Sequence, residues 1–299
     1  MQARFLVRMI ASVAAGAALC YGEPAPLRVS VSIPPLQGLA ARLGGDRVVV
    51  SSFMAENQDP HTFSPTPRAV AELGECAVFF AVGIDFEATL CEKVRRTFPN
   101  LEIVDVTTGL ERSPGGAHEE HGAEAHEPAA EHAHEHLTDP HLWLSLPNLT
   151  HMAGKMAEAL KRRLPEQREA IERNLAVLTA ELAAAHAEFG RQLAPWRGTT
   201  FYVYHPSFGY FARDYGLVQE AVEIDGKSPA PRQLGALVEQ AAREKVRVIF
   251  VQPQFPERAA RVLAERIGGE VIAVNHLSPD PVGTLRQAVA ALARAPAPR

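Results

Sequence analysis

Short apolar runs alternate with longer amphipathic segments along most of the chain. The apolar runs are rich in Val, Ile and Phe, as is typical of buried β-strands, and the segments after them repeat apolar residues every three or four positions, as helices do. In the first half the predicted strands span residues 27–33, 48–54, 78–82 and 103–106, and the predicted helices span 36–43, 67–74, 86–97 and 147–164.

The second half of the chain repeats the same order of elements. Its predicted strands span residues 200–204, 218–223, 246–251 and 271–274, and its predicted helices span 207–215, 231–244, 256–267 and 282–293. Strands that alternate with helices form parallel sheets covered on both faces. We therefore predict an α/β protein of two lobes, each with a four-stranded, mostly parallel sheet flanked by helices.

One long helical segment separates the two halves. Residues 165–193 contain no proline after the first position and place Leu178, Leu182 and Phe189 on one apolar face. Such a helix is about 43 Å long, which is enough to join two lobes rigidly. His186 lies on the same face, where we expect it to pack and not to bind metal. The expected organisation is a signal peptide at 1–22, an N-terminal lobe at 23–164, a linking helix at 165–194 and a C-terminal lobe at 195–299.

The N-terminus has the plan of a secretory signal peptide. Arg4 and Arg8 precede an apolar run at 9–19 that is too short for a permanent membrane span, and no later segment reaches that length. We therefore expect an exported, periplasmic protein. Cys20 offers an alternative, attachment to the membrane as a lipoprotein. Leu19 occupies the position where lipoproteins carry a small residue, which favours simple cleavage.

Two cysteines remain in the mature chain, Cys76 and Cys91. An oxidising compartment permits them to pair, and two free buried thiols are the equal alternative. Their spacing matches neither a zinc knuckle nor a redox motif.

Composition and charge indicate a globular protein and argue against one class of function, nucleic-acid binding. The chain has 299 residues, of which 46% are hydrophobic and 22% charged, which is a globular composition with room for two domains. A formal net charge of −5 and the lack of a basic stripe argue against nucleic acid as a partner.

A histidine-rich stretch at 117–138 has no counterpart elsewhere in the chain. It contains six glutamates and no Lys or Arg, so it cannot form a packed core. Neutral imidazoles are ligands for divalent metals, and the composition favours an auxiliary metal-binding loop. An acidic solvated loop is the alternative. Its histidines are His118, His121, His126, His132, His134 and His136.

Other histidines fall at the ends of predicted strands. His61 follows the second strand, His141 the fourth and His205 the first strand of the second half, while His276 follows the last. In open parallel sheets ligands bind outside the carboxyl ends of the strands. We therefore predict that imidazoles from both lobes meet in one crevice, where adjacent prolines restrict the backbone.

The motifs around these histidines resemble a known family. NQDPHTFSPTP at 57–67, the His-rich insertion, DPHLWLSLPN at 139–148, HPSFGYFARDYGL at 205–217 and SPAPRQL at 228–234 are similar to zinc-binding members of the metal-specific periplasmic solute-binding proteins of ABC importers, the ZnuA-like cluster A-I family. The likeness covers nearly the whole mature chain. It implies two lobes joined by a rigid helix, with one metal between them.

The resemblance also implies ligands and partners. It maps the three histidine ligands onto His61, His141 and His205, and it makes Asp280 the first candidate for the fourth position, with water, His276 or Asn275 as alternatives. The implied partners are a membrane permease and a periplasmic metallochaperone, and the implied state is a monomer.

Three imidazoles favour Zn²⁺ as the metal, because manganese sites contain more carboxylates. The sequence thus predicts high-affinity capture of zinc for import by an ABC permease, with no enzymatic activity. The alternatives are a manganese importer component, an extracellular zinc buffer or adhesin, and a three-histidine zinc hydrolase. The hydrolase lacks a His-Glu-x-x-His helix, although Glu56 could be argued as its general base.

Overall fold

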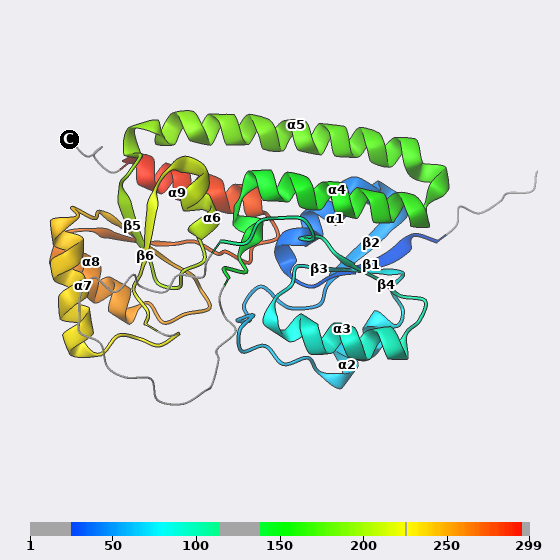
Figure 1. Ribbon diagram of the computed structural model, residues 1–299, viewed down its shortest axis with the longest axis horizontal. Coiled ribbons are helices and arrows are strands. Elements are labelled where there is room, and N and C mark those ends of the chain that lie inside the picture. The colour runs from blue at the N-terminus through cyan, green and yellow to red at the C-terminus, as the bar shows by residue number, and fades with distance from the viewer. Residues whose placement is uncertain (1–24, 114–137, 225, 295–299) are drawn as a thin grey trace, which may run out of the picture.

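The computed structural model describes residues 25–113, 138–224 and 226–294, which form two lobes with one parallel sheet each (Figure 1). The N-terminal sheet contains β1 (Leu27–Val31), β2 (Val48–Ser52), β3 (Val78–Ala81) and β4 (Glu102–Asp105) in the order β2-β1-β3-β4. The C-terminal sheet contains β5 (Thr200–Val203), β6 (Val218–Ala221), β7 (Val248–Val251) and β8 (Glu270–Ala273) in the order β6-β5-β7-β8. The two lobes therefore share one topology, and the predicted fold class is confirmed.

Strand composition follows position in each sheet. The inner strands β3 and β7 read VFFA and VIFV and are buried at every residue, because helices cover both of their faces. The edge strands β4 and β6 read EIVD and VQEA and are partly exposed. Charged residues on an edge also discourage pairing with another chain.

Helices cover both faces of each sheet (Figure 1). One face of the N-terminal sheet packs against α1 (Gln37–Gly44) and α4 (Leu146–Arg163), and the other against α2 (Pro67–Leu73) and α3 (Asp85–Thr97). The C-terminal sheet lies between α6 (Gly209–Tyr215) with α9 (Pro281–Arg294) and α7 (Pro231–Arg243) with α8 (Arg258–Ile267).

Helix α5 (Arg168–Leu193) runs along the top of both lobes in Figure 1. It is bonded to each lobe: the Asn174 amide donates to the Leu43 carbonyl at 3.0 Å, and Arg286 of α9 pairs with Glu188 at 3.0 Å. His186 on this helix packs against Tyr215, with its Nδ1 3.1 Å from the phenolic oxygen, as predicted for a residue outside the metal site.

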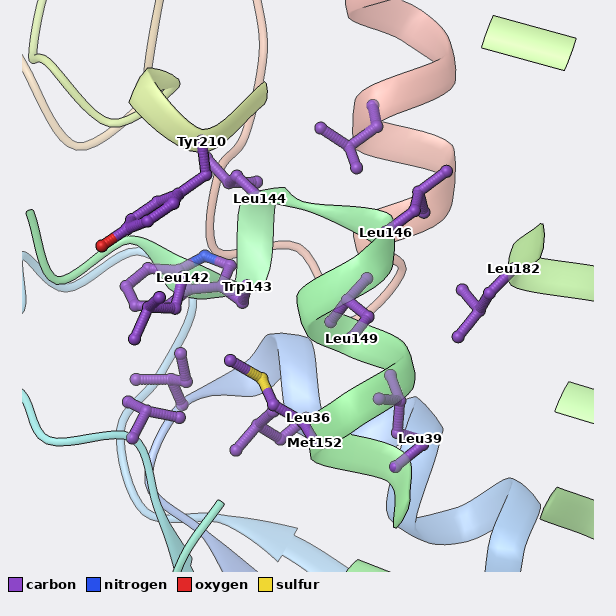
Figure 2. Packing of buried hydrophobic residues seen from close by; sticks show 14 of the residues in the cluster. Leu36, Leu39, Leu142, Trp143, Leu144, Leu146, Leu149, Met152, Leu182 and Tyr210 are labelled. Atoms are coloured by element: carbon purple, nitrogen blue, oxygen red, sulfur yellow. The ribbon is translucent and has the colours of Figure 1, made fainter. Parts of the chain in front are cut away.

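The face of α5 that points inward joins the two lobes through one apolar core. Buried side chains of α1, α4, α5, α6 and α9 belong to a single cluster that includes residues of both sheets. Figure 2 shows part of it, where Leu36 and Met152 of the N-terminal lobe lie below Trp143, and Tyr210 of the C-terminal lobe lies above. Smaller clusters under α2 and α3 and under α7 and α8 complete each lobe.

Several predictions from the sequence fall outside the described residues: the signal peptide, Cys20 and the six loop histidines. Within the described residues, no helix is long and apolar enough to cross a membrane. Cys76 and Cys91 lie in the same apolar cluster under α2 and α3, and both are free thiols.

Candidate metal centre

Three histidines meet in the cleft between the lobes. His61 lies on the loop between β2 and α2, His141 between β4 and α4, and His205 between β5 and α6. One ring nitrogen of each lies within 4.8 Å of the corresponding atoms of the other two. The equivalent sheet edges of the two lobes thus face each other, and each contributes imidazole to the same point.

His141 and His205 come from opposite lobes and nearly touch. Their Nε2 atoms are 3.3 Å apart, and both side chains are buried. Nδ1 of His141 lies 2.8 Å from Asp139 Oδ1, and Nδ1 of His205 lies 2.7 Å from Glu223 Oε1. A carboxylate that accepts the Nδ1 proton leaves Nε2 as an unprotonated acceptor. With both carboxylates ionised, two nitrogen lone pairs therefore point into the same small space, an arrangement that a cation would stabilise.

His61 is the exposed member of the group. Its Nδ1 lies 3.5 Å from Asp85 Oδ2, so a carboxylate faces Nδ1 in this residue too. The backbone N–H of His61 donates to Asp59 Oδ1 at 3.0 Å, which closes a tight turn before the ring. Thr66 then caps α2, whose first residue is Pro67. Asp59 thus shapes the loop, whereas Asp85 faces the imidazole.

The backbone of His205 is held on both sides by one side chain. Gln252, at the end of β7, accepts from the His205 N–H at 3.2 Å and donates to the His205 carbonyl at 2.7 Å. The His205 ring also stacks on Phe255, with centroids 4.7 Å apart and planes at 20°. These contacts, together with the Glu223 carboxylate, fix the direction in which Nε2 points.

His141 is fixed by contacts that cross between the lobes. Asp139 accepts from the backbone N–H of His141 at 2.9 Å as well as facing its ring. The carbonyl of Asp139 accepts from the hydroxyl of Tyr210 in α6 at 2.7 Å, and that hydroxyl accepts from the N–H of Ser113 at 3.1 Å. A Cβ at Gly209 would meet Asp139 Oδ2 at 2.5 Å, so α6 approaches this closely only because the residue is glycine.

Burial keeps the imidazoles of His61 and His141 in the form that binds metal. It lowers the pKa of His141 well below its usual value, and the neighbouring His205 lowers that pKa further. Burial and His205 also lower the pKa of His61. Burial raises the pKa of Asp139 to about 7, against the opposing effect of its bond to the His141 backbone N–H. Neutral imidazole is the species that coordinates a cation.

The candidates for a fourth ligand occupy different environments. Asp280 is exposed and precedes α9, where its Oδ1 accepts from the Gly283 N–H at 2.9 Å, so it caps that helix. The Asn275 oxygen accepts from Gln254 Nε2 at 2.9 Å and from the Leu277 N–H at 3.1 Å. His276 is buried beside His141 and His205. Neither His276 nor Asp280 belongs to the group of ligand atoms within 4.8 Å of one another found in the described residues.

The sequence did not identify the residues that orient the imidazoles. Asp85 begins α3, Glu223 follows β6 and Gln252 follows β7. Glu223 and Gln252 stand at the carboxyl ends of the two strands that flank β5, which carries His205, so the strand order would have indicated these two. Asp85 follows β3, which is not a neighbour of β2, so strand order does not relate it to His61. The sequence alone does not give that order.

The fold and the converging imidazoles are those of a two-lobed solute-binding protein with a candidate cation site between its lobes. A sequence model of the family described as "ZnuA: Zinc-uptake complex component A periplasmic" matches residues 29–295. The chain belongs to this family of periplasmic zinc-binding components of metal uptake, and Zn²⁺ is the ion that it binds.

Individual relatives show the same relationship. A candidate metal-binding protein of Treponema pallidum (strain Nichols) is 29% identical over 247 residues, which cover 82% of this chain and 78% of that protein. The zinc-binding lipoprotein AdcA of Streptococcus pneumoniae is 26% identical over 257 residues, or 84% of this chain and 50% of AdcA. The chain thus spans about half the length of AdcA. A crystal structure of ZnuA has a TM-score of 0.80 at 31% identity and covers 90% of this chain and 99% of that one.

Proposed function

We propose that the protein captures Zn²⁺ outside the cytoplasmic membrane and delivers it to the permease of an ABC importer. In this proposal His61, His141 and His205 bind the ion between the lobes. The family supplies the general role in zinc uptake, and the geometry of the cleft supplies the reason for assigning these residues.

The observation that carries the assignment is the 3.3 Å between Nε2 of His141 and Nε2 of His205. Two nitrogens on one tetrahedral zinc, each at about 2.0–2.1 Å from the metal, are about 3.3 Å apart. When the His141 and His205 rings donate their Nδ1–H groups to Asp139 and Glu223, both Nε2 atoms are hydrogen-bond acceptors. Two acceptors cannot hydrogen-bond to each other. A shared zinc ion would satisfy both.

The same arrangement favours binding over catalysis. A hydrolase needs a general base that can reach a water on the metal. Asp139 and Glu223 lie on the Nδ1 side of their imidazoles, away from the Nε2 atoms that face the centre. Their placement suits the orientation of ligands and leaves them poorly placed for proton transfer from a metal-bound water.

The nitrogen-rich centre also favours zinc over manganese. Manganese prefers carboxylate, carbonyl and water ligands, whereas imidazole suits zinc. The buried carboxylates beside the imidazoles, Asp139 and Glu223, are hydrogen-bonded to the Nδ1 side of the histidine rings. A manganese importer component would be expected to present at least one of them to the ion.

The proposed organisation of the whole chain follows the elements. An exported precursor with a signal peptide at 1–22 would mature to an N-terminal lobe at 23–164, a linking helix at 165–194 and a C-terminal lobe at 195–299. The ends of α4 at Arg163 and of α5 at Leu193 support these limits. Periplasmic export agrees with the description of the family.

The test is a zinc competition against a chelator of known affinity, using the full mature chain. Replacing His61, His141 or His205 by alanine should weaken zinc binding at least about tenfold. His151→Ala is the matched control, because His151 lies on α4, where its ring bonds the Thr108 carbonyl, and it is outside the group of three. Unchanged affinity in all three variants would refute the site.

Delivery is tested in cells that lack the native gene. Wild type should restore growth in zinc-depleted medium, and His205→Ala should not. If the His205→Ala strain grew at the wild-type rate with equal protein levels, zinc delivery would not depend on this site.

A further inference from the structure

One histidine beside the cleft has no hydrogen-bond partner. His276 follows β8, its side chain is 1% exposed, and neither Nδ1 nor Nε2 has a partner among the described residues. Its backbone is nevertheless well held, since the His276 carbonyl accepts from Trp143 Nε1 of the other lobe at 2.8 Å. The loop is thus fixed, and only the imidazole is left unsatisfied.

Buried polar groups in folded proteins are almost always hydrogen-bonded, because burying them unpaired is costly. Each of the other three histidines has a carboxylate facing Nδ1, so at least one nitrogen of each ring is paired. His276 has no such partner among the described residues. A partner that arrives only in the loaded state would explain why both of its nitrogens are unpaired.

The ring lies beside the two buried members of the group. Its centroid lies 5.8 Å from that of His141 and 6.1 Å from that of His205. The three gathered histidines have centroids 5.0 to 5.7 Å apart. Imidazoles on one tetrahedral zinc have centroids about 5 Å apart. His276 therefore stands about 1 Å too far from His141 and His205, and it would have to move inward by about that distance to share the ion.

The competing oxygen ligands already have partners. Asp280 caps α9 through the Gly283 N–H, and the Asn275 oxygen accepts two hydrogen bonds, from Gln254 and Leu277. Recruiting either oxygen would break those bonds. Recruiting His276 breaks none and satisfies a buried atom.

We propose that His276 is the fourth zinc ligand, so that four imidazole nitrogens, two from each lobe, surround the ion. This inference rests on the proposed function of the cleft and deepens it. A closed tetrahedral shell leaves no position for water on the metal, which suits binding and not catalysis. It also explains how a chain can specify zinc without a carboxylate ligand.

The test is zinc K-edge X-ray absorption on the full mature chain loaded with one equivalent of Zn²⁺. Wild type should show four imidazoles, and His276→Leu should show three imidazoles and an oxygen from water. Chelator competition should show zinc affinity at least about tenfold lower in the variant. Leucine removes the unpaired nitrogens, so the metal-free variant should unfold at or above the wild-type temperature.

Asp280→Asn is the matched control, because asparagine caps helices as well as aspartate does but offers no carboxylate. It should keep four imidazoles and wild-type affinity. If His276→Leu fails to fold, His276→Gln serves in the same two measurements. It keeps a polar side chain of similar size and should also lose one imidazole from the spectrum.

Two outcomes would overturn the inference. One is a wild-type spectrum with three imidazoles and an oxygen that stays the same in the His276 variant. The other is a loss of the oxygen in Asp280→Asn. Either outcome leaves the proposed function intact if His141→Ala still loses tight binding. Full binding in His141→Ala would instead refute the proposed function itself.

Discussion

The Glu223 carboxylate lies 2.7 Å from Nδ1 of His205, and both side chains are buried at the edge of the C-terminal sheet. A carboxylate in this position fixes the imidazole tautomer and raises its basicity toward a metal on the other nitrogen. We expect Glu223→Gln to lower zinc affinity about 10- to 100-fold in chelator competition. The fold should be unchanged.

Glu239→Gln is the control for this prediction, since Glu239 is an exposed residue of α7. It should bind zinc as wild type does. Equal affinities in the two variants would show that Glu223 does not act through His205.

The Asp139 carboxyl predicts how zinc binding depends on pH. Burial raises its pKa to about 7, so the metal-free protein holds a proton there below that pH. A nearby dication disfavours that proton, and binding should release it. Affinity should therefore rise about tenfold per pH unit up to about 7 and then level off. The lowered pKa values of His61 and His141 keep those rings neutral over this range.

Asp139→Asn tests this assignment, because asparagine can still accept the bonds from His141. Its affinity should depend less steeply on pH between about 6 and 7 than that of wild type. Calorimetry in buffers of different ionisation enthalpy measures the protons released. Release of a full proton by both proteins at pH 6.5 would contradict the role of Asp139.

The His-rich segment should be removable without loss of the tight site. The Asp139 N–H donates to the Ser113 carbonyl at 2.9 Å, so the chain on either side of the segment already meets. Deleting residues 117–135 therefore leaves a short connection between fixed ends. We expect calorimetry to lose the weaker zinc-binding events and keep one tight event per chain. The thermal stabilisation by one equivalent of zinc should stay nearly the same. Loss of the tight event would mean that the segment supplies ligands to the cleft.

Gln254 bridges the two lobes at the mouth of the cleft. Its amide donates to the Glu56 carbonyl, on the loop that carries His61, and to the Asn275 oxygen at 2.9 Å. Removing it should free the loop of His61 and speed zinc release. We expect Gln254→Ala to raise the dissociation rate several-fold in stopped-flow chelation. Gln287→Ala is the control, because Gln287 bonds the Ala273 carbonyl within one lobe.

Much of the fold was predictable because the apolar runs match the helices and strands, and breaker residues such as proline mark where these elements begin or end. The last helix, predicted at 282–293, spans Pro281–Arg294. The errors have local causes. The strand predicted from Val246 begins at Val248, because the Val246 N–H bonds the Ala241 carbonyl and still belongs to the end of α7. Lys245, with φ of 56°, turns the chain between α7 and β7.

The site was only partly predictable. Parallel strands place their carboxyl ends together, which is why His61, His141 and His205 could be expected to meet. Which group faces Nδ1 of each depends on strand order and on the direction of side chains. Glu223 became a neighbour of His205 because β6 lies beside β5. For the same reason the sequence could not choose among Asn275, His276 and Asp280, which lie in one connection between β8 and α9 but have different surroundings.

The shared core predicts how the lobes unfold. Leu182 of α5 is 2% exposed and belongs to the cluster that runs through both lobes. Leu182→Ala should lower the free energy of unfolding by about 2–5 kcal/mol, with one transition in denaturant. Val177→Ala, at a position of the same helix that is 55% exposed, should change it little. Two separate transitions in the wild type would show that the lobes unfold independently.

The exposure of His61 separates how strongly the proposed site holds the ion from how fast it releases the ion. His141 and His205 are buried and each faces a carboxylate, so in the proposed site they should determine how strongly the ion is held. His61 lies on a loop at the surface, and its bond to the metal should be the first to break. A receptor that touched only this loop could therefore shorten the residence time of the ion without unfolding either lobe. Release on contact would then be a property of one exposed ligand in an otherwise buried site.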